Sequence, residues 1–187
     1  MINAVLLFGG KSVEHDISVI TYTQVLNAID LKKYNVKSVY MSGSTSTNYA
    51  YLEILETINK YNIPIYETYV GQKIVDKEKL QLQVVSTQKI DNPEDANITS
   101  VCTKLTYDNI SFLFMGDAGY RKNDGESIAL NSGIDLKSDV LKVGHHGSPY
   151  SSSDEFVKKV SPKYAVITTA DKSITNHPYA SAISRLK

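Results

Sequence analysis

The hydrophobic pattern of the chain predicts short strands that alternate with amphipathic helices. Apolar residues run almost without interruption through 4–8 and 110–115, which is typical of strands that are buried on both faces. In contrast, Leu80, Leu82 and Val84 alternate with glutamines, which predicts a strand with one face in water. Continuous apolar runs, alternating patterns and helical spacing of apolar residues predict the other strands and helices of the chain in the same way.

The first 42 residues predict a strand–helix–strand unit. The strand at 4–8 ends in Gly9-Gly10, apolar residues then recur at helical spacing over 17–29, and a second strand covers 36–41. This βαβ pattern favours parallel pairing of the two strands. The Gly-Gly turn could receive an anion on its free N–H groups, and a simple tight turn explains it at least as well.

The rest of the chain predicts an α/β fold, with a mixed sheet and flanking helices. Asp108-Asn109 is a two-residue loop suited to a hairpin between two strands. Ser152 and Glu155 have the spacing of a capping box that opens a helix. That helix faces inward with Phe156, Val157 and Val160, and the other expected helices lie at 49–61, 126–130 and 180–186. The further strands are expected at 63–66, 101–107, 110–115, 140–143 and 164–169.

The stretch 139–153 is the part around which the chain is organised. Its apolar run ends in Gly144, and His145 and His146 then stand before Gly147 and Ser148. Glycines leave little backbone bulk around imidazoles at the end of a strand. Adjacent residues of an extended chain point to opposite sides, so the two histidines need not share a role.

Asp117, His145 and His177 each follow an apolar strand, and they could converge at one end of a sheet. A carboxylate and two imidazoles are suitable ligands for zinc, manganese or iron, and such a metal lowers the pKa of bound water. An alternative interpretation makes the histidines turn, core or surface residues and makes Gly116-Asp117 an ordinary turn.

Composition excludes some classes of function. The chain has 20 Lys and Arg against 20 Asp and Glu, so its net charge does not indicate a nucleic-acid or membrane partner. A local basic patch could still bind DNA. Cys102 is the single cysteine, which rules out an intramolecular disulfide and a multi-cysteine zinc site. Without a leader or an apolar run of about 18 residues, the chain is expected to be soluble and cytoplasmic.

Two family resemblances refine this picture. FGGKSVEHDISVITYTQVLNAID resembles the amino terminus of D-alanine–D-alanine ligases. That resemblance implies that Glu14 helps to hold the amino group of a substrate, beside Gly9 and Gly10. It covers about the first 40 residues, and the nucleotide-binding lysines and magnesium-binding carboxylates of those ligases have no counterpart further along the chain.

The second resemblance covers roughly residues 33–187. FLFMGDA, then DVLKVGHHGSPYSSSDEFVKKVSPKYAVITT, then NHP resemble the later half of a metallo-β-lactamase-fold hydrolase, of the kind found in competence DNA-uptake proteins. This resemblance implies that Asp117, His145 (or His146) and His177 bind metal, while His146 and Ser148 orient the site by hydrogen bonds. The implied fold is an incomplete αββα sandwich.

This sequence departs from the hydrolase pattern in its first half. The His-x-His-x-Asp-His motif that supplies most ligands of the first metal is absent, and the ligase-like unit stands in its place. The chain therefore resembles a chimera, with a ligase-like unit at 1–42, docked on the same sheet, and the later half of a hydrolase domain at 43–187. One zinc or manganese ion at most is expected. His15 or Glu14 adds a further ligand only if the turn of the ligase-like unit lies near the place of the turn that carries the missing motif.

Three functions follow as expectations. The first is an impaired metal-dependent hydrolase of phosphodiesters, on a small molecule or a nucleic acid, related to DNA uptake. The second is a catalytically silent structural or interaction module, and the third a D-alanine–D-alanine ligase-like fragment. Because amino-terminal strands of the hydrolase fold are missing, an exposed sheet edge is expected to favour a homo-oligomer.

Overall fold

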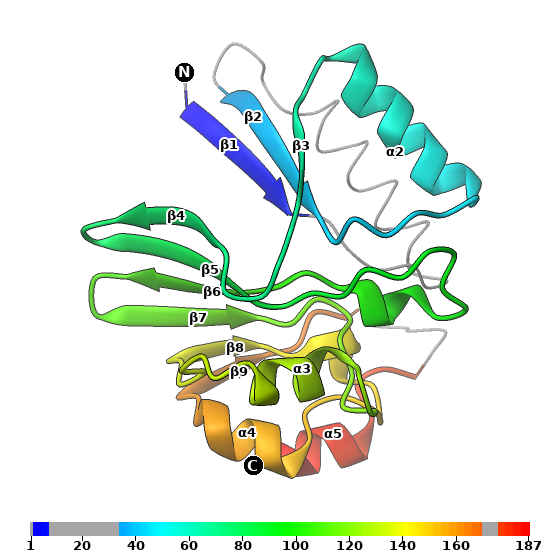
Figure 1. Cartoon of the computed structure of the whole chain (residues 1–187). Coiled ribbons are helices and arrows are strands. Elements are labelled where there is room, and N and C mark those ends of the chain that lie inside the picture. The colour runs from blue at the N-terminus through cyan, green and yellow to red at the C-terminus, as the bar shows by residue number, and fades with distance from the viewer. Residues whose placement is uncertain (1, 8–33, 170–175) are drawn as a thin grey trace.

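The computed structural model describes residues 2–7, 34–169 and 176–187, and it places them in two sheets with flanking helices (Figure 1). The α/β class with a mixed sheet is thereby confirmed. The ligase-like helix expected at 17–29, together with Gly9, Gly10 and Glu14, lies outside the described residues. The division of the chain at residue 42 stays a prediction.

The smaller sheet contains three parallel strands in the order β1-β2-β3, namely β1 (Ile2–Leu7), β2 (Tyr34–Met41) and β3 (Ile65–Glu67). Helix α2 (Tyr49–Lys60) joins β2 to β3 and packs its apolar stripe against the sheet. Ile54 and Ile58 of the helix and Val39 of β2 are fully buried there. The helix has the extent that its periodicity predicts.

The larger sheet contains six strands in the order β4-β5-β6-β7-β8-β9. The strands are β4 (Lys73–Lys77), β5 (Leu80–Ser86), β6 (Cys102–Tyr107), β7 (Ile110–Phe114), β8 (Val140–Lys142) and β9 (Tyr164–Val166). Pairing is antiparallel from β4 to β7 and parallel from β7 to β9. The expected hairpin is confirmed, because Tyr107 pairs with Ile110 around Asp108, whose φ of 50° suits a tight turn.

Helices α3 (Gly125–Asn131), α4 (Asp154–Val160) and α5 (Ala180–Arg185) follow in the carboxyl-terminal part. A short 3-10 turn covers Ala96–Thr99, and an irregular tight turn covers Gly144–Gly147. Phe156 and Val160 of α4 and Ala129 of α3 share one buried cluster with Leu113 of β7 and Leu141 of β8. This cluster is the main core, and it holds the ends of β7 and β8 firmly in place.

Three sequence predictions need correction. Strand β4 was not among the expected strands, because its charged ends hide the two apolar residues between them. The strand expected at 164–169 ends at Val166. The capping box is wrong by one residue: Ser153, not Ser152, accepts the hydrogen bond from the Phe156 N–H and so caps α4.

Candidate functional site

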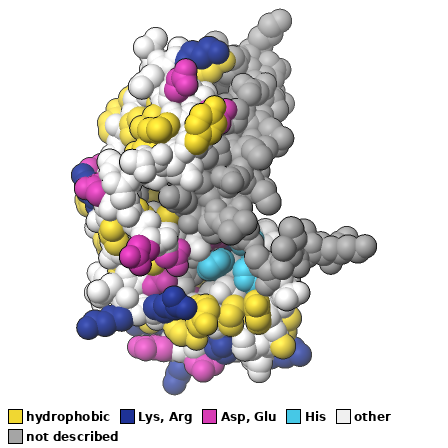
Figure 2. Space-filling view, turned by 90° about the vertical axis from the view of Figure 1, so that its right-hand side faces the viewer, with side chains coloured by type: hydrophobic (Ala, Val, Ile, Leu, Met, Phe, Trp, Pro, Cys, Tyr) yellow, Lys and Arg dark blue, Asp and Glu magenta, His cyan; other side chains and the backbone are white. Residues whose placement is uncertain are grey.

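The chemistry-bearing residues gather at the carboxyl ends of β7 and β8. Asp117 follows β7 after a two-residue turn, and His145 and His146 follow β8 after Gly144. Because β7 and β8 are parallel, both chain ends reach the same edge of the sheet. Figure 2 looks onto this edge and shows histidine side chains at the surface, next to acidic and hydrophobic ones.

The histidine turn has an unusual backbone. His145 and His146 have φ values of 46° and 51°, in the left-handed region that residues with a Cβ seldom occupy. The turn is therefore not extended. The expectation that His145 and His146 point to opposite sides of an extended chain was wrong about the backbone. The two histidines nevertheless differ in role, because their rings contact different partners. Such backbone geometry tends to occur at functional sites.

Close packing holds this turn against the end of β7. The His145 N–H donates to the Gly116 carbonyl oxygen at 3.0 Å. A Cβ on Gly144 would stand 2.5 Å from the carbonyl oxygen of Ala118, closer than real Cβ atoms come to backbone. Only glycine therefore allows the two turns to approach at this point.

Asp117 and His146 form a hydrogen-bonded ion pair. Asp117 Oδ1 lies 3.2 Å from His146 Nε2, and both side chains are largely buried. On its other side His146 Nδ1 lies 2.6 Å from the carbonyl oxygen of Thr168, which can only accept. The Asp117 N–H donates to Ser100 Oγ at 3.1 Å, and this hydrogen bond fixes the backbone that carries the carboxylate.

The pKa values of this pair move apart. Burial opposes ionisation of Asp117, but the hydrogen bond from His146 and the charges of His146 and Lys142 outweigh it and hold the Asp117 pKa below its usual value. The hydrogen bond to Asp117 raises the pKa of His146, against the effect of burial. With acceptors on both ring nitrogens, His146 is stabilised as an imidazolium beside a carboxylate.

His145 belongs to a second group of side chains. Its Nε2 lies 3.4 Å from Asn97 Nδ2, and its ring meets that of His177 edge-on, with centroids 5.5 Å apart. His177 in turn lies beside Tyr179, with ring centroids 5.6 Å apart. Asn97 is buried, and its Oδ1 has no hydrogen-bond partner among the described residues. The structure thus brings His145 to His177 and His146 to Asp117.

Ser148 has a local role in the turn. It is buried, and its Oγ accepts a hydrogen bond from the Tyr150 N–H at 3.1 Å, while its own N–H donates to the His145 carbonyl oxygen. Sequence reasoning did not identify Asn97, Ser100 or Thr168 as partners of the site. No local signal marks them, since each lies at least 17 residues from the group it contacts.

The described residues do not fit a complete metal centre. In residues 2–7, 34–169 and 176–187, no group of three His, Cys, Asp or Glu side chains is placed to hold a metal ion. Asp117 and His146 satisfy each other, and His145 faces His177 instead. The assignment of Asp117, His145 and His177 as metal ligands therefore stays a prediction, and His15 and Glu14 lie outside the described ranges.

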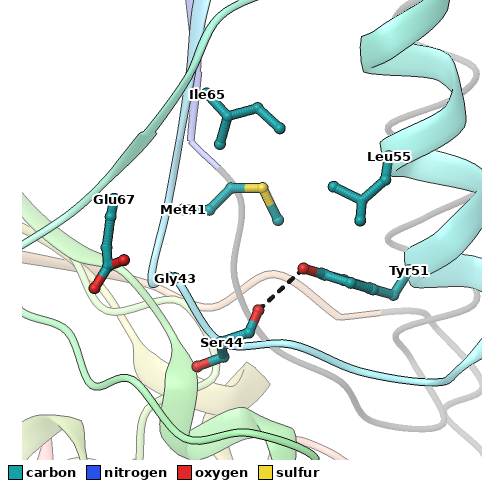
Figure 3. A pocket seen from close by; sticks show the side chains of 7 residues that line it. All are labelled: Met41, Gly43, Ser44, Tyr51, Leu55, Ile65 and Glu67. Carbon is teal, nitrogen blue, oxygen red and sulfur yellow. Dashed lines mark hydrogen bonds between the residues drawn. The ribbon is translucent and has the colours of Figure 1, made fainter.

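A separate small cavity lies at the carboxyl end of the three-stranded sheet, between that edge and α2 (Figure 3). Its volume is about 270 Å³. Tyr51 Oη donates to the Ser44 carbonyl oxygen at 3.1 Å at one end of it, and Glu67 stands at the other. Burial, with the charge of Asp91, raises the pKa of the Tyr51 phenol and keeps it neutral. The other lining residues are Met41, Gly43, Leu55 and Ile65.

Comparisons with known proteins find two kinds of similarity, one to D-alanine–D-alanine ligases and one to competence proteins. The family model described as D-ala D-ala ligase N-terminus matches residues 3–147. The D-alanine--D-alanine ligase of Thermosipho melanesiensis is 59% identical over 44 residues, which are 24% of this chain and 12% of the ligase. ComE operon protein 3 of Bacillus subtilis is 28% identical over 157 residues, which are 84% of this chain and 20% of that protein.

Among solved structures, the metallo-beta-lactamase fold protein YhfI from Bacillus subtilis covers 97% of this chain and 70% of its own, with a TM-score of 0.46 and 9% sequence identity. The chain spans about a fifth of the length of ComE operon protein 3 and about an eighth of that of the ligase. A ligase-like segment and a competence-protein-like segment are thus joined in one chain, as the sequence predicted. None of the helices within the described ranges combines the length and apolar character needed to span a bilayer.

Proposed function

The chain belongs to the D-ala D-ala ligase N-terminus family, whose model matches residues 3–147, and we propose that its chemistry nevertheless lies in its competence-protein-like part. The proposed function is that of a competence-related metallo-β-lactamase-type module. Its ancestral reaction is metal-dependent hydrolysis of a phosphodiester, and its present activity is impaired.

One observation carries this proposal: the Asp117–His146 pair and the His145–His177 contact lie together at the carboxyl ends of two parallel strands. This is where an α/β sheet places its ligand site. The similarity to ComE operon protein 3, over 84% of the chain, supports a relation of this part to competence proteins.

Impairment is proposed from two facts about the chain. The sequence contains no His-x-His-x-Asp-His motif, so most ligands of a first metal are missing. In the described residues the remaining donors form pairs rather than a group of three. A two-metal mechanism needs both ions about 3.5–4 Å apart. We therefore propose that one divalent ion at most binds, weakly, to Asp117 and the neighbouring histidines.

The test is metal content together with hydrolysis. The purified protein is loaded with zinc or manganese, passed through a desalting column and measured by elemental analysis, with a His145→Ala variant beside it. About one metal per chain that is lost in the variant supports a surviving half-site, and hydrolysis of bis(p-nitrophenyl) phosphate is then measured. A His15→Ala variant shows whether the amino-terminal histidine contributes a ligand.

A second candidate function is a catalytically silent interaction module. The mutual pairing of Asp117 and His146 favours it, because each group already satisfies the other. Absence of bound metal in the wild-type protein and in His145→Ala would select this function over the hydrolase.

A third candidate is a ligase-like fragment that binds a small molecule at the cavity beside α2 (Figure 3). Its volume suits a ligand of a few heavy atoms, and it lies at the carboxyl edge of a parallel sheet, where such ligands bind. Calorimetric titration with D-alanine and with ATP tests this candidate, and heat of binding lost in Tyr51→Phe or Glu67→Gln would support it.

A further inference from the structure

A row of apolar side chains crosses the whole six-stranded sheet. Residues that pair in register across strands lie on the same face of the sheet. The register of the six strands places in one such row Val75, Leu82, Leu105, Phe112, Val140 and Tyr164. Every strand of the sheet contributes one apolar residue to it.

Two neighbouring rows extend this face along the strands. Leu80, Tyr107 and Ile110 pair on one side of the first row, and Phe114 and Val166 lie in the row on its other side. The rings of Phe112 and Phe114 lie nearly parallel, with centroids 6.3 Å apart, which joins the first row to its neighbour. We call these three rows the open face.

The open face is the side of the sheet that lacks a helical cover among the described elements. The alternate residues Leu113 and Leu141 point the other way and are fully buried in the core with α4. Five large apolar side chains of the open face remain accessible, although Val84 and Thr103, which lie in the same row as Phe114, are buried. The exposed fractions are 57% for Tyr107, 51% for Ile110, 39% for Phe114, 68% for Tyr164 and 46% for Val166.

The size of the open face is that of an interaction patch. Large apolar side chains present about 150–250 Å² each, so these five exposed fractions amount to on the order of 500 Å². Half-buried residues of the first row add to this area. Contiguous apolar patches beyond a few hundred Å² mark interaction sites, and a standard interface buries about 800 Å² per partner.

The chemistry of the open face favours a copy of itself. Its charged members are Lys142 and, on edge strand β4, Lys77. The Lys142 ammonium donates to the Gly116 carbonyl oxygen at 2.9 Å and so is drawn toward the end of β7. Two lysines among these described residues give no strong field for a nucleic acid or another strongly charged partner, whereas a largely apolar sheet complements an identical sheet.

We propose that two copies of this chain associate face to face through their open faces. Two such sheets pack about 10 Å apart with their strands at about −30°, as in a β-sandwich, and a two-fold axis near Leu105 and Phe112 makes the contact closed and symmetric. This contact differs from pairing through a sheet edge. It goes beyond the proposed function and does not rest on it.

The test is sedimentation velocity between about 1 and 100 μM protein. A dimer is expected, because the exposed apolar area is of the size that marks interaction sites. The double variant Ile110→Lys with Tyr164→Lys buries four like charges in the interface, and its dimer dissociation constant should rise at least about a hundredfold. The matched control is Tyr49→Lys with Leu52→Lys, which changes two exposed residues of α2 outside the open face.

Circular dichroism verifies that each variant is folded, and a cross-link gives an independent measurement. A Phe112→Cys variant, near the proposed axis, should form a covalent dimer on mild oxidation, whereas Tyr49→Cys should not. A wild-type protein that stays monomeric at 100 μM overturns the proposal. So does a dimer that survives the Ile110 and Tyr164 substitutions, or one that the α2 control abolishes equally, because either result places the contact elsewhere.

Discussion

The buried carboxylate of Glu126 ties α3 to the start of α4 through Ser153. Its Oε2 accepts hydrogen bonds from the Ser153 N–H at 2.9 Å and from Ser153 Oγ at 3.0 Å, while Oε1 accepts one from the Ser152 N–H. Glu126 is completely buried, although it lies in the first turn of its helix. The segment that follows the histidine turn is therefore tied to α3 through this one carboxylate.

We first predict a pH dependence of stability from Glu126. Burial raises its pKa, against the opposing hydrogen bonds from Ser153 and Ser152, and the charge of Asp124 raises it further. The folded state thus keeps this proton to higher pH than the unfolded state. Its contribution to stability is present below the unfolded pKa of about 4.3 and is lost as pH rises through the folded pKa.

Glu126→Gln removes that dependence, because the amide does not ionise. Urea unfolding at pH 4, 5.5 and 7 should show that the variant gains stability relative to wild type as pH rises. Glu155→Gln, an exposed change on α4, is the control and should show no such trend. A difference between wild type and Glu126→Gln that does not change with pH would contradict the prediction.

The second prediction separates the two serines before α4. Ser153→Ala removes the cap on the Phe156 N–H and the hydrogen bond to Glu126, so the free energy of unfolding should fall by about 1–2 kcal/mol. Ser152→Ala should change it by less than about 0.5 kcal/mol, because Ser152 Oγ has no hydrogen-bond partner among the described residues. Equal losses in the two variants would show that the capping assignment is wrong.

The third prediction concerns Cys102, the single cysteine. It is completely buried on β6, and its Sγ donates to the Met115 carbonyl oxygen at 3.3 Å. Burial, together with the charges of Asp124 and Glu126, raises the pKa of the thiol, which keeps it protonated and unreactive. Ellman's reagent should label about one thiol per chain in urea and almost none in the folded protein. Rapid labelling of the native protein would contradict this burial.

Much of the fold could be predicted, because its elements follow from local periodicity. The apolar run before Gly116 indicated β7, the alternation of Leu80, Leu82 and Val84 indicated β5, and Asp108-Asn109 indicated the hairpin between β6 and β7. Strand β4 was missed because an edge strand with one bulge and charged ends has no such pattern.

The candidate site was predictable in location but not in its contacts. Glycines after apolar runs placed Asp117 and the histidines at one sheet edge, since parallel strands end together. Which ring meets Asp117 depends on the left-handed turn at His145 and His146, and the pattern of residue types does not specify that conformation. The Thr168 contact depends on tertiary packing, because it joins positions 22 residues apart.

The last prediction tests whether the close approach at Gly144 holds the site together. Gly144→Ala places a Cβ 2.5 Å from the Ala118 carbonyl oxygen, and neither backbone can yield without moving its turn. The free energy of unfolding should fall by about 1–3 kcal/mol, as in other overpacked cores. Since Ala118 adjoins Asp117, the same shift should weaken the Asp117–His146 pair, and the His146 ring signals in an NMR spectrum should move.

Gly71→Ala is the matched control for this effect. Gly71 has a φ of 90°, and a Cβ added there would meet no atom of the described residues within 4 Å, so its substitution costs backbone strain without crowding. It should destabilise the protein while leaving the His146 signals where they are in wild type. If both variants move those signals, global loosening explains the result. If Gly144→Ala moves none, the two turns are not coupled through this contact.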